Sequence, residues 1–126
     1  MIIDFHTHIF PDKIAAKTIR ALAEAANVEA ATDGTLNGLM QSMDKHGVEI
    51  SVIQPVVTKP DQFESINQFA QYVNTKYEGR LISFGGIHPD CEDYKAKLDT
   101  IKSLGIKGIK IHPDYQRVLI DDVRYM

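Results

Sequence analysis

The chain has 126 residues, of which 44% are hydrophobic and 25% are charged, a composition typical of a globular domain rather than a disordered one. Its formal net charge of −3 and its pI of about 5.9 give no electrostatic reason to expect nucleic acid or an anionic membrane as a partner. A single cysteine, Cys91, excludes an intrachain disulfide, and since we expect neither a signal peptide nor a membrane span, the sequence predicts a cytoplasmic protein.

Strand-like and helix-like segments alternate along the chain. Runs of β-branched and aromatic residues bounded by turn formers predict strands at residues 2–6, 48–57, 81–87 and 106–111. Apolar residues at helical spacing predict four helices in the gaps, which begin near Pro11, Thr35, Asp61 and Tyr94. The order is therefore β-α-α-β-α-β-α-β, and Asp121 with Asp122 predicts the start of a further helix.

Several residues predict where the helices begin and end. Thr35 is expected to cap the second helix, and Asp61 with Glu64 resembles a capping box at the start of the third. Three glycines are expected to end the second, third and fourth helices: Gly47, Gly79 and Gly105.

Alternation of this kind predicts right-handed β-α-β crossovers, a parallel sheet and outer helices. A closed eight-stranded (β/α) barrel typically needs about 250 residues, and four strands make half of one. We therefore predict that residues 1–126 form one partial barrel domain, the N-terminal half of a TIM barrel, which stops before the fifth strand.

The clearest chemistry lies at the end of the first strand, in Asp4-Phe5-His6-Thr7-His8. Side chains two residues apart on a strand share a face, so His6 and His8 can reach one metal ion, zinc above all. The alternative is a pair of polar residues bonded to nearby loops. Asp4 lies one step deeper on the same face, where it can approach the metal or, as we favour, orient its ligands.

Histidines also follow the third and fourth strands. His88 and His112 each precede a proline, which places both at strand exits, where reactive groups of parallel α/β folds gather. Each is a candidate substrate contact or supplementary metal ligand, or else a structural histidine. Lys110 is predicted to point inward, where it needs a negative partner such as Asp4 or a covalent modification. An ion pair with Asp4 is favoured slightly over a direct catalytic role.

These motifs resemble those of a known family. Asp4-Phe5-His6-Thr7-His8 with Phe10-Pro11, then 81–89 and 108–113, is similar to the opening motif and the third and fourth strands of the amidohydrolase-related group that includes aminocarboxymuconate-semialdehyde decarboxylase. The resemblance covers nearly the whole chain. It implies a distorted TIM barrel with a divalent metal, usually zinc, in which His6 and His8 match the first two ligands. It also implies that the remaining ligands, and a histidine that acts as general acid or base, belong to a second half.

The leading hypothesis is thus a metal-dependent hydrolase that acts on a small polar or carboxylated molecule, incomplete in this chain. A zinc-dependent non-oxidative decarboxylase is an alternative that the sequence does not separate from it. A phosphoesterase or nuclease is disfavoured by Ile9-Phe10-Pro11. The third alternative is a catalytically inactive half-barrel, and because its edges would be open, we predict self-association as a homodimer or larger assembly.

Overall fold

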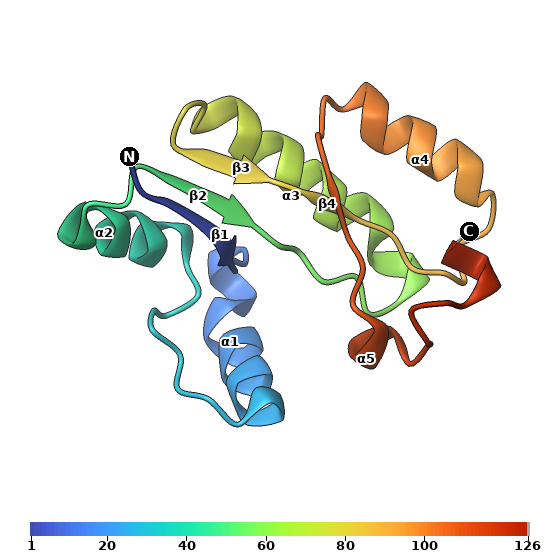
Figure 1. The fold of residues 1–126 in the computed structure, drawn as a ribbon, viewed down its shortest axis with the longest axis horizontal. Helices are drawn as coiled ribbons and strands as arrows, with labels where there is room; N and C mark the ends of the chain where they lie inside the picture. Colours follow the sequence, from blue (N-terminus) through green and yellow to red (C-terminus); the bar gives the residue numbers. More distant parts are fainter. Residues whose placement is uncertain (126) are drawn as a thin grey trace. The chain divides into compact units, whose positions relative to one another are not determined.

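The computed structural model describes residues 1–125 (Figure 1). The chain divides into two compact units, one from Met1 to Ile53 and one that begins at Gln54, and each is described by itself. No helix among the described residues has both the length and the apolar character that a bilayer span requires.

The first unit holds two strands and two helices. Strand β1 (Ile3–Thr7) is followed by α1 (Asp12–Ala26), α2 (Leu36–His46) and β2 (Ile50–Ile53), and β1 pairs with β2 in parallel. Its buried apolar side chains come from α1, α2, β2 and the loop after β1: Ile9, Ala15, Leu39, Met43, Val52 and Ile53. The parallel pairing follows from the two helices that intervene, which allow the chain to return to the same end of the sheet.

The cap predicted for α2 is confirmed. The Thr35 side chain accepts a hydrogen bond from the Gly38 amide at 2.9 Å, and Asp33 Oδ1 accepts one from the Thr35 hydroxyl at 2.7 Å. Hydrogen bonds from Thr35 lower the pKa of Asp33, so this carboxylate stays charged in the turn before the helix. Gly47 ends α2 at a φ of 69°, in the left-handed region that glycine adopts without steric cost.

The second unit contains three short strands and several helical segments. It runs through a 3₁₀ turn η1 (Pro60–Gln62), α3 (Phe63–Lys76), β3 (Leu81–Ser83), β4 (Gly85–Gly86), α4 (Tyr94–Ser103), β5 (Ile109–Lys110), α5 (Pro113–Gln116) and a 3₁₀ turn η2 (Val123–Tyr125). Strands β4 and β5 pair in parallel. A core from α3, α4 and the strand ends fills the unit: Phe63, Ala70, Ile87, Cys91, Ile101 and Ile106.

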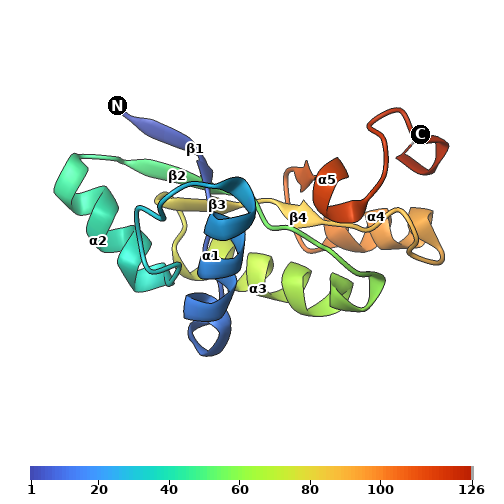
Figure 2. The ribbon, with the colours of Figure 1, turned by 90° about the horizontal axis from the view of Figure 1, so that it is seen from below.

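Helix α3 runs beside the β3–β4 segment (Figures 1 and 2). Two asparagines of the helix hydrogen-bond to this segment. Asn67, which is 1% exposed, accepts from the Gly86 amide at 3.1 Å and donates to the Gly86 carbonyl at 2.8 Å. Asn74 makes the same pair of bonds with Ser83, at 2.6 Å from the amide and 3.0 Å to the carbonyl. Each side-chain amide thus supplies the hydrogen bonds that a neighbouring strand would otherwise provide.

Several predicted element boundaries were wrong. The strand predicted at 81–87 is divided into β3 and β4, and those predicted at 48–57 and 106–111 shrink to Ile50–Ile53 and Ile109–Lys110. Val123–Tyr125 form a 3₁₀ turn and not the α-helix predicted to start at Asp121 and Asp122, whereas the short helix Pro113–Gln116 was not predicted.

The capping box predicted at the start of α3 was also wrong. Pro60 begins a 3₁₀ turn, so Asp61 lies inside that turn and cannot take the extended backbone conformation of an N-cap. The Gln62 side chain replaces it, because its Oε1 accepts from the Thr58 amide at 2.8 Å and from the Lys59 amide at 3.2 Å.

Candidate functional site

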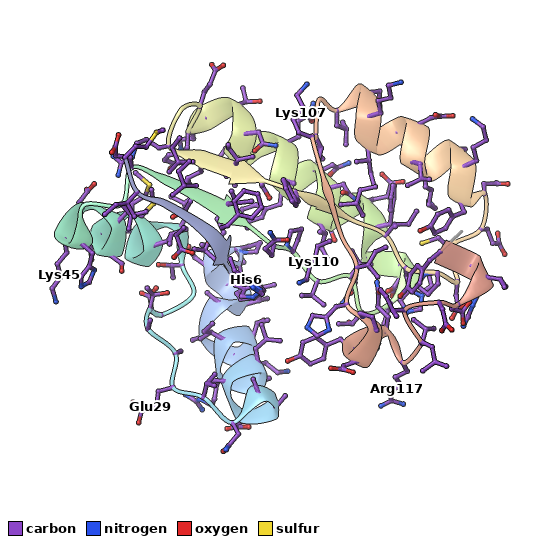
Figure 3. All side chains as sticks on the ribbon, in the orientation of Figure 1. His6, Glu29, Lys45, Lys107, Lys110 and Arg117 are labelled. Atoms are coloured by element: carbon purple, nitrogen blue, oxygen red, sulfur yellow. The ribbon has the colours of Figure 1, made fainter. Side chains whose placement is uncertain are left out.

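His6 lies near the C-terminal end of β1 in the first unit (Figure 3), and His8 follows the strand directly. The pairing with β2 contains a bulge, because three steps from Asp4 to Thr7 match two steps from Ser51 to Ile53. A bulge inserts an extra residue and redirects the side chains beside it, so strict alternation does not hold at His6. The two rings nevertheless remain neighbours, with centroids 5.0 Å apart and planes at 62°.

This separation is compatible with a shared metal ion. Two imidazoles that bind one tetrahedral zinc at roughly 2.0–2.1 Å have ring centroids about 5 Å apart. Among residues 1–125, no group of three or more histidine, cysteine, aspartate or glutamate side chains is placed to hold a metal. The pair therefore fits as part of a metal site, and a closed site would need further ligands.

Asp4 is engaged beside this pair. Its Oδ1 accepts a hydrogen bond from the His6 backbone amide at 3.1 Å. This bond holds the Asp4 carboxylate against the bulged segment of β1. Such a contact suits a residue that orients His6 as a candidate metal ligand.

A pocket of about 520 Å³ lies in the second unit, a volume within the usual range for small-molecule sites. Its walls come from the segment after β2, the loop after β4, helix α5 and the C-terminal turn. The lining residues are Thr58, Lys59, His88, Asp90, Tyr115, Gln116, Arg117, Val118 and Arg124. Three of them are cations and one is a carboxylate; because Arg124 is paired with Asp90 and with the adjacent Asp122, the positive excess of the walls comes from Lys59 and Arg117.

His88 is the pocket residue predicted from sequence. It is 5% exposed and follows β4, as expected. Its Nδ1 accepts a hydrogen bond from the Asp90 amide at 3.2 Å, so the neutral ring carries its proton on Nε2. A metal-bound histidine usually donates from the ring nitrogen that does not touch the metal. The geometry therefore favours His88 as a hydrogen-bond donor to a ligand over a role as supplementary metal ligand.

A chain of charges runs along the rim of the pocket. Arg124 donates to Asp90 and, at 2.8 Å through Nε, to Asp122. This side-chain hydrogen bond from Arg124 is the main reason that the pKa of Asp122 falls to about 2. The same two carboxylates raise the pKa of Arg124, which stays charged at any ordinary pH. Arg124 thus ties the C-terminal turn to the loop that carries His88.

Lys59 and Arg117 are the other cations of the pocket. In the described part of the chain, no ion pair engages either side chain, and Arg117 extends away from the end of α5 (Figure 3). A guanidinium in this state can bind a carboxylate through two parallel hydrogen bonds, whereas a lysine acts as a point charge.

The remaining predicted residues take different places. His112 precedes α5, and its ring lies against Tyr115, with centroids 4.3 Å apart. Tyr115 lines the pocket, so His112 supports one of its walls. Lys110 lies on β5 and is half-buried (Figure 3). The proposed pairing of Lys110 with Asp4 stays a prediction.

Of the nine lining residues, the sequence predicted only His88, and four of the others matter most for the charge and shape of the pocket. Lys59, Arg117 and Arg124 are isolated basic residues in loops and turns, with no spacing that distinguishes them from a solvated surface. Gln116 lies in a four-residue helix that apolar periodicity cannot reveal. The one available signal was the strand exit itself, which marked His88 and His112 and hence the rim of the pocket.

No family model matches the chain, and no curated protein matches it by sequence. Among solved structures, the chain is similar to a probable 2-pyrone-4,6-dicarboxylic acid hydrolase from Acinetobacter baumannii, crystallised with citric acid bound. The TM-score is 0.53 at 20% sequence identity, and the match covers 92% of this chain and 43% of the hydrolase. The likeness shows the fold alone.

The shared fold bears on the architecture predicted from sequence. A chain of mixed α/β structure, with parallel strand pairs and intervening helices, that spans less than half of a longer hydrolase fits a partial barrel. The particular family suggested by the motifs remains a prediction.

Proposed function

We propose that this chain is part of a metal-dependent hydrolase that acts on a small carboxylated molecule. The observation that carries the proposal is the positively charged pocket of the second unit. Its volume of about 520 Å³ suits a small metabolite, and its lining combines cations with hydrogen-bond donors. An arginine guanidinium binds a planar carboxylate through two parallel hydrogen bonds, and Arg117 supplies such a group in the lining.

The His6–His8 pair supports the metal-dependent part of the proposal. These residues would hold a divalent cation, most simply zinc, through ring nitrogens at the end of β1. When bound, such a metal lowers the pKa of a coordinated water toward neutrality and polarises a carbonyl. Asp4 would hold the backbone of His6, and His88 would donate from Nε2 to an anionic ligand in the pocket.

The similar hydrolase agrees with this assignment only by analogy. Its name describes a dicarboxylic acid substrate, and its crystal contains citric acid, a tricarboxylic acid. The chain spans 43% of that protein. The proposed activity is therefore that of an enzyme to which this chain contributes a part. Non-oxidative decarboxylation at a metal held by His6 and His8 is the alternative chemistry.

A second candidate function, a non-catalytic and self-associating half-barrel, is favoured by one observation. Ile3 and Phe5 on β1 are 46% and 63% exposed, although strand residues of this type are normally covered. Adjacent exposed apolar side chains on a strand mark an association surface. A second copy of the chain would bury them.

The metal assignment is tested by elemental analysis of the purified protein after incubation with zinc and gel filtration. We expect stoichiometric zinc in the unmodified chain or its assembly, and its loss in His6→Ala. His46→Ala is the matched control, because His46 is the last residue of α2 and its ring hydrogen-bonds to Ser42 O of the same helix at 2.9 Å. Equal zinc in all three proteins, or none in any, would refute zinc binding by His6 and His8.

The pocket assignment is tested separately with citrate and metal-free protein, so that chelation does not contribute. We expect saturable binding in calorimetry, and Arg117→Gln should weaken it about tenfold, since a charge-assisted hydrogen bond contributes roughly 1.5–3 kcal/mol. Lys107→Gln removes an exposed lysine outside the pocket lining and should leave affinity unchanged. Absence of citrate binding, or equal losses in both variants, would count against a carboxylate site.

A further inference from the structure

We propose that Gln116 is a positioning residue that sets the spacing of the pocket walls and thereby the affinity of the pocket for its ligand. The inference rests on the proposed carboxylate site and adds a residue that the metal and cation arguments do not use. Gln116 is the last residue of α5 and is 5% exposed.

The side-chain amide of Gln116 has all its hydrogen-bonding capacity used. Its Nε2 donates to the Val57 carbonyl at 2.9 Å and to the Ile87 carbonyl at 2.8 Å. Its Oε1 accepts from the His112 amide at 3.2 Å and from the Tyr125 hydroxyl at 2.6 Å. Two carbonyls require the NH₂ group and one backbone amide requires the oxygen, so these partners fix the orientation of the side chain.

These bonds join segments that are far apart in the sequence. Val57 and Ile87 lie 59 and 29 residues before Gln116, and the residues that follow them directly, Thr58 and His88, line the pocket. Tyr125 belongs to the turn that also carries Arg124. Burial raises the pKa of Tyr125, so its hydroxyl keeps the proton that it donates. One amide therefore connects every wall of the pocket.

No other side chain satisfies the same set of partners. Glutamate has the same length but cannot donate to two carbonyls, and its charge would be buried against them. Leucine has a similar volume but would leave two carbonyls and one amide without partners in a buried site. Asparagine is one methylene shorter and cannot span the same distances. The residue type at position 116 is thus specified by hydrogen bonding as well as by packing.

The test compares Gln116→Glu and Gln116→Leu with the unmodified chain by citrate titration of metal-free protein. We expect both variants to bind citrate at least tenfold more weakly. Val73→Ala is the control for general destabilisation, because Val73 is fully buried on α3 and does not line the pocket. Its affinity for citrate should equal that of the unmodified chain.

A second readout keeps the outcome decisive. Amide hydrogen exchange at Thr58 and His88 should accelerate in the Gln116 variants more than at α3 residues, whether or not citrate binds. If the unmodified chain binds citrate and the variants bind it equally well, the positioning role is refuted. If the unmodified chain fails to bind citrate, the proposed function fails, and exchange at Thr58 and His88 alone decides the role of Gln116: local acceleration supports it, and unchanged exchange overturns it.

Discussion

Replacement of Asn67 should cost the second unit much of its stability. Its side chain makes hydrogen bonds with both backbone groups of Gly86, at 2.8 and 3.1 Å, and with the Phe63 carbonyl at 2.8 Å. In Asn67→Ala the buried amide and carbonyl of Gly86 lose these partners. Since an unsatisfied buried polar group costs roughly 1–3 kcal/mol, we expect a loss of about 2–6 kcal/mol in unfolding free energy. That is a large share of the roughly 5–15 kcal/mol that stabilises a typical domain.

The assay is urea denaturation followed by circular dichroism at the helical band. Asn67→Leu separates the polar defect from loss of volume, because leucine nearly fills the site and should still be strongly destabilising. Gln68→Ala, an exposed amide on the same helix, should change the free energy by less than about 0.5 kcal/mol. If both Asn67 variants also stay within that margin, the hydrogen bonds to Gly86 do not stabilise the fold, and the argument is refuted.

Four further outcomes are expected. Thr35→Ala should lower the unfolding free energy by about 1 kcal/mol through loss of the α2 cap, and an unchanged urea midpoint would contradict this. Gly86→Ala should cost about 1–3 kcal/mol by overpacking, because a Cβ there would lie 2.4 Å from Val57 Cγ2, and a variant that unfolds at the same urea concentration as the unmodified chain would refute the overpacking. In a carboxyl-detected titration, Asp122 should have a pKa of about 2, moving toward 3.8 in Arg124→Gln, so its stabilising contact is present above pH 3.8 and is lost as the pH falls through about 2. Light scattering at tens of micromolar should give a mass above that of one chain, and a stable monomer would argue against self-association.

The order of the helices and strands could be predicted because it depends on local sequence patterns. Apolar periodicity marked α1 to α4, and Thr35 and Gly47 marked the ends of α2, because caps depend on local backbone geometry alone. The strand exits at His88 and His112 were visible for the same reason, since proline after histidine restricts the backbone of its neighbour.

Features that depend on distant partners could not be predicted. The division of the segment 81–87 follows from its pairing, since β4 pairs with β5 and β3 belongs to a different sheet. The hydrogen bonds of Asn67 and Asn74 to Gly86 and Ser83 likewise come from a distant helix. The bulge in β1 depends on register with β2, which the sequence of β1 alone does not contain.

The pocket shows the same limit. Arg117, Arg124 and Lys59 come from separate segments, and only the fold of the second unit brings them to one cavity. Composition gave a net charge of −3 for the chain, which conceals a local concentration of positive charge. The net charge of a chain therefore bears on binding to polyanions such as nucleic acid. It does not indicate whether a few side chains bind a small anion.

The two asparagines of α3 fix the register between this helix and the β3–β4 segment. Seven helical residues rise about 10.5 Å, and three strand residues extend about 10 Å, so the spacing from Asn67 to Asn74 matches that from Gly86 to Ser83. A slip of one residue between helix and strand would misplace both amides at once. The position of the segment from β4 to His88 is thereby fixed by α3, so a mutation in this helix can shift residues after β4 that it does not contact.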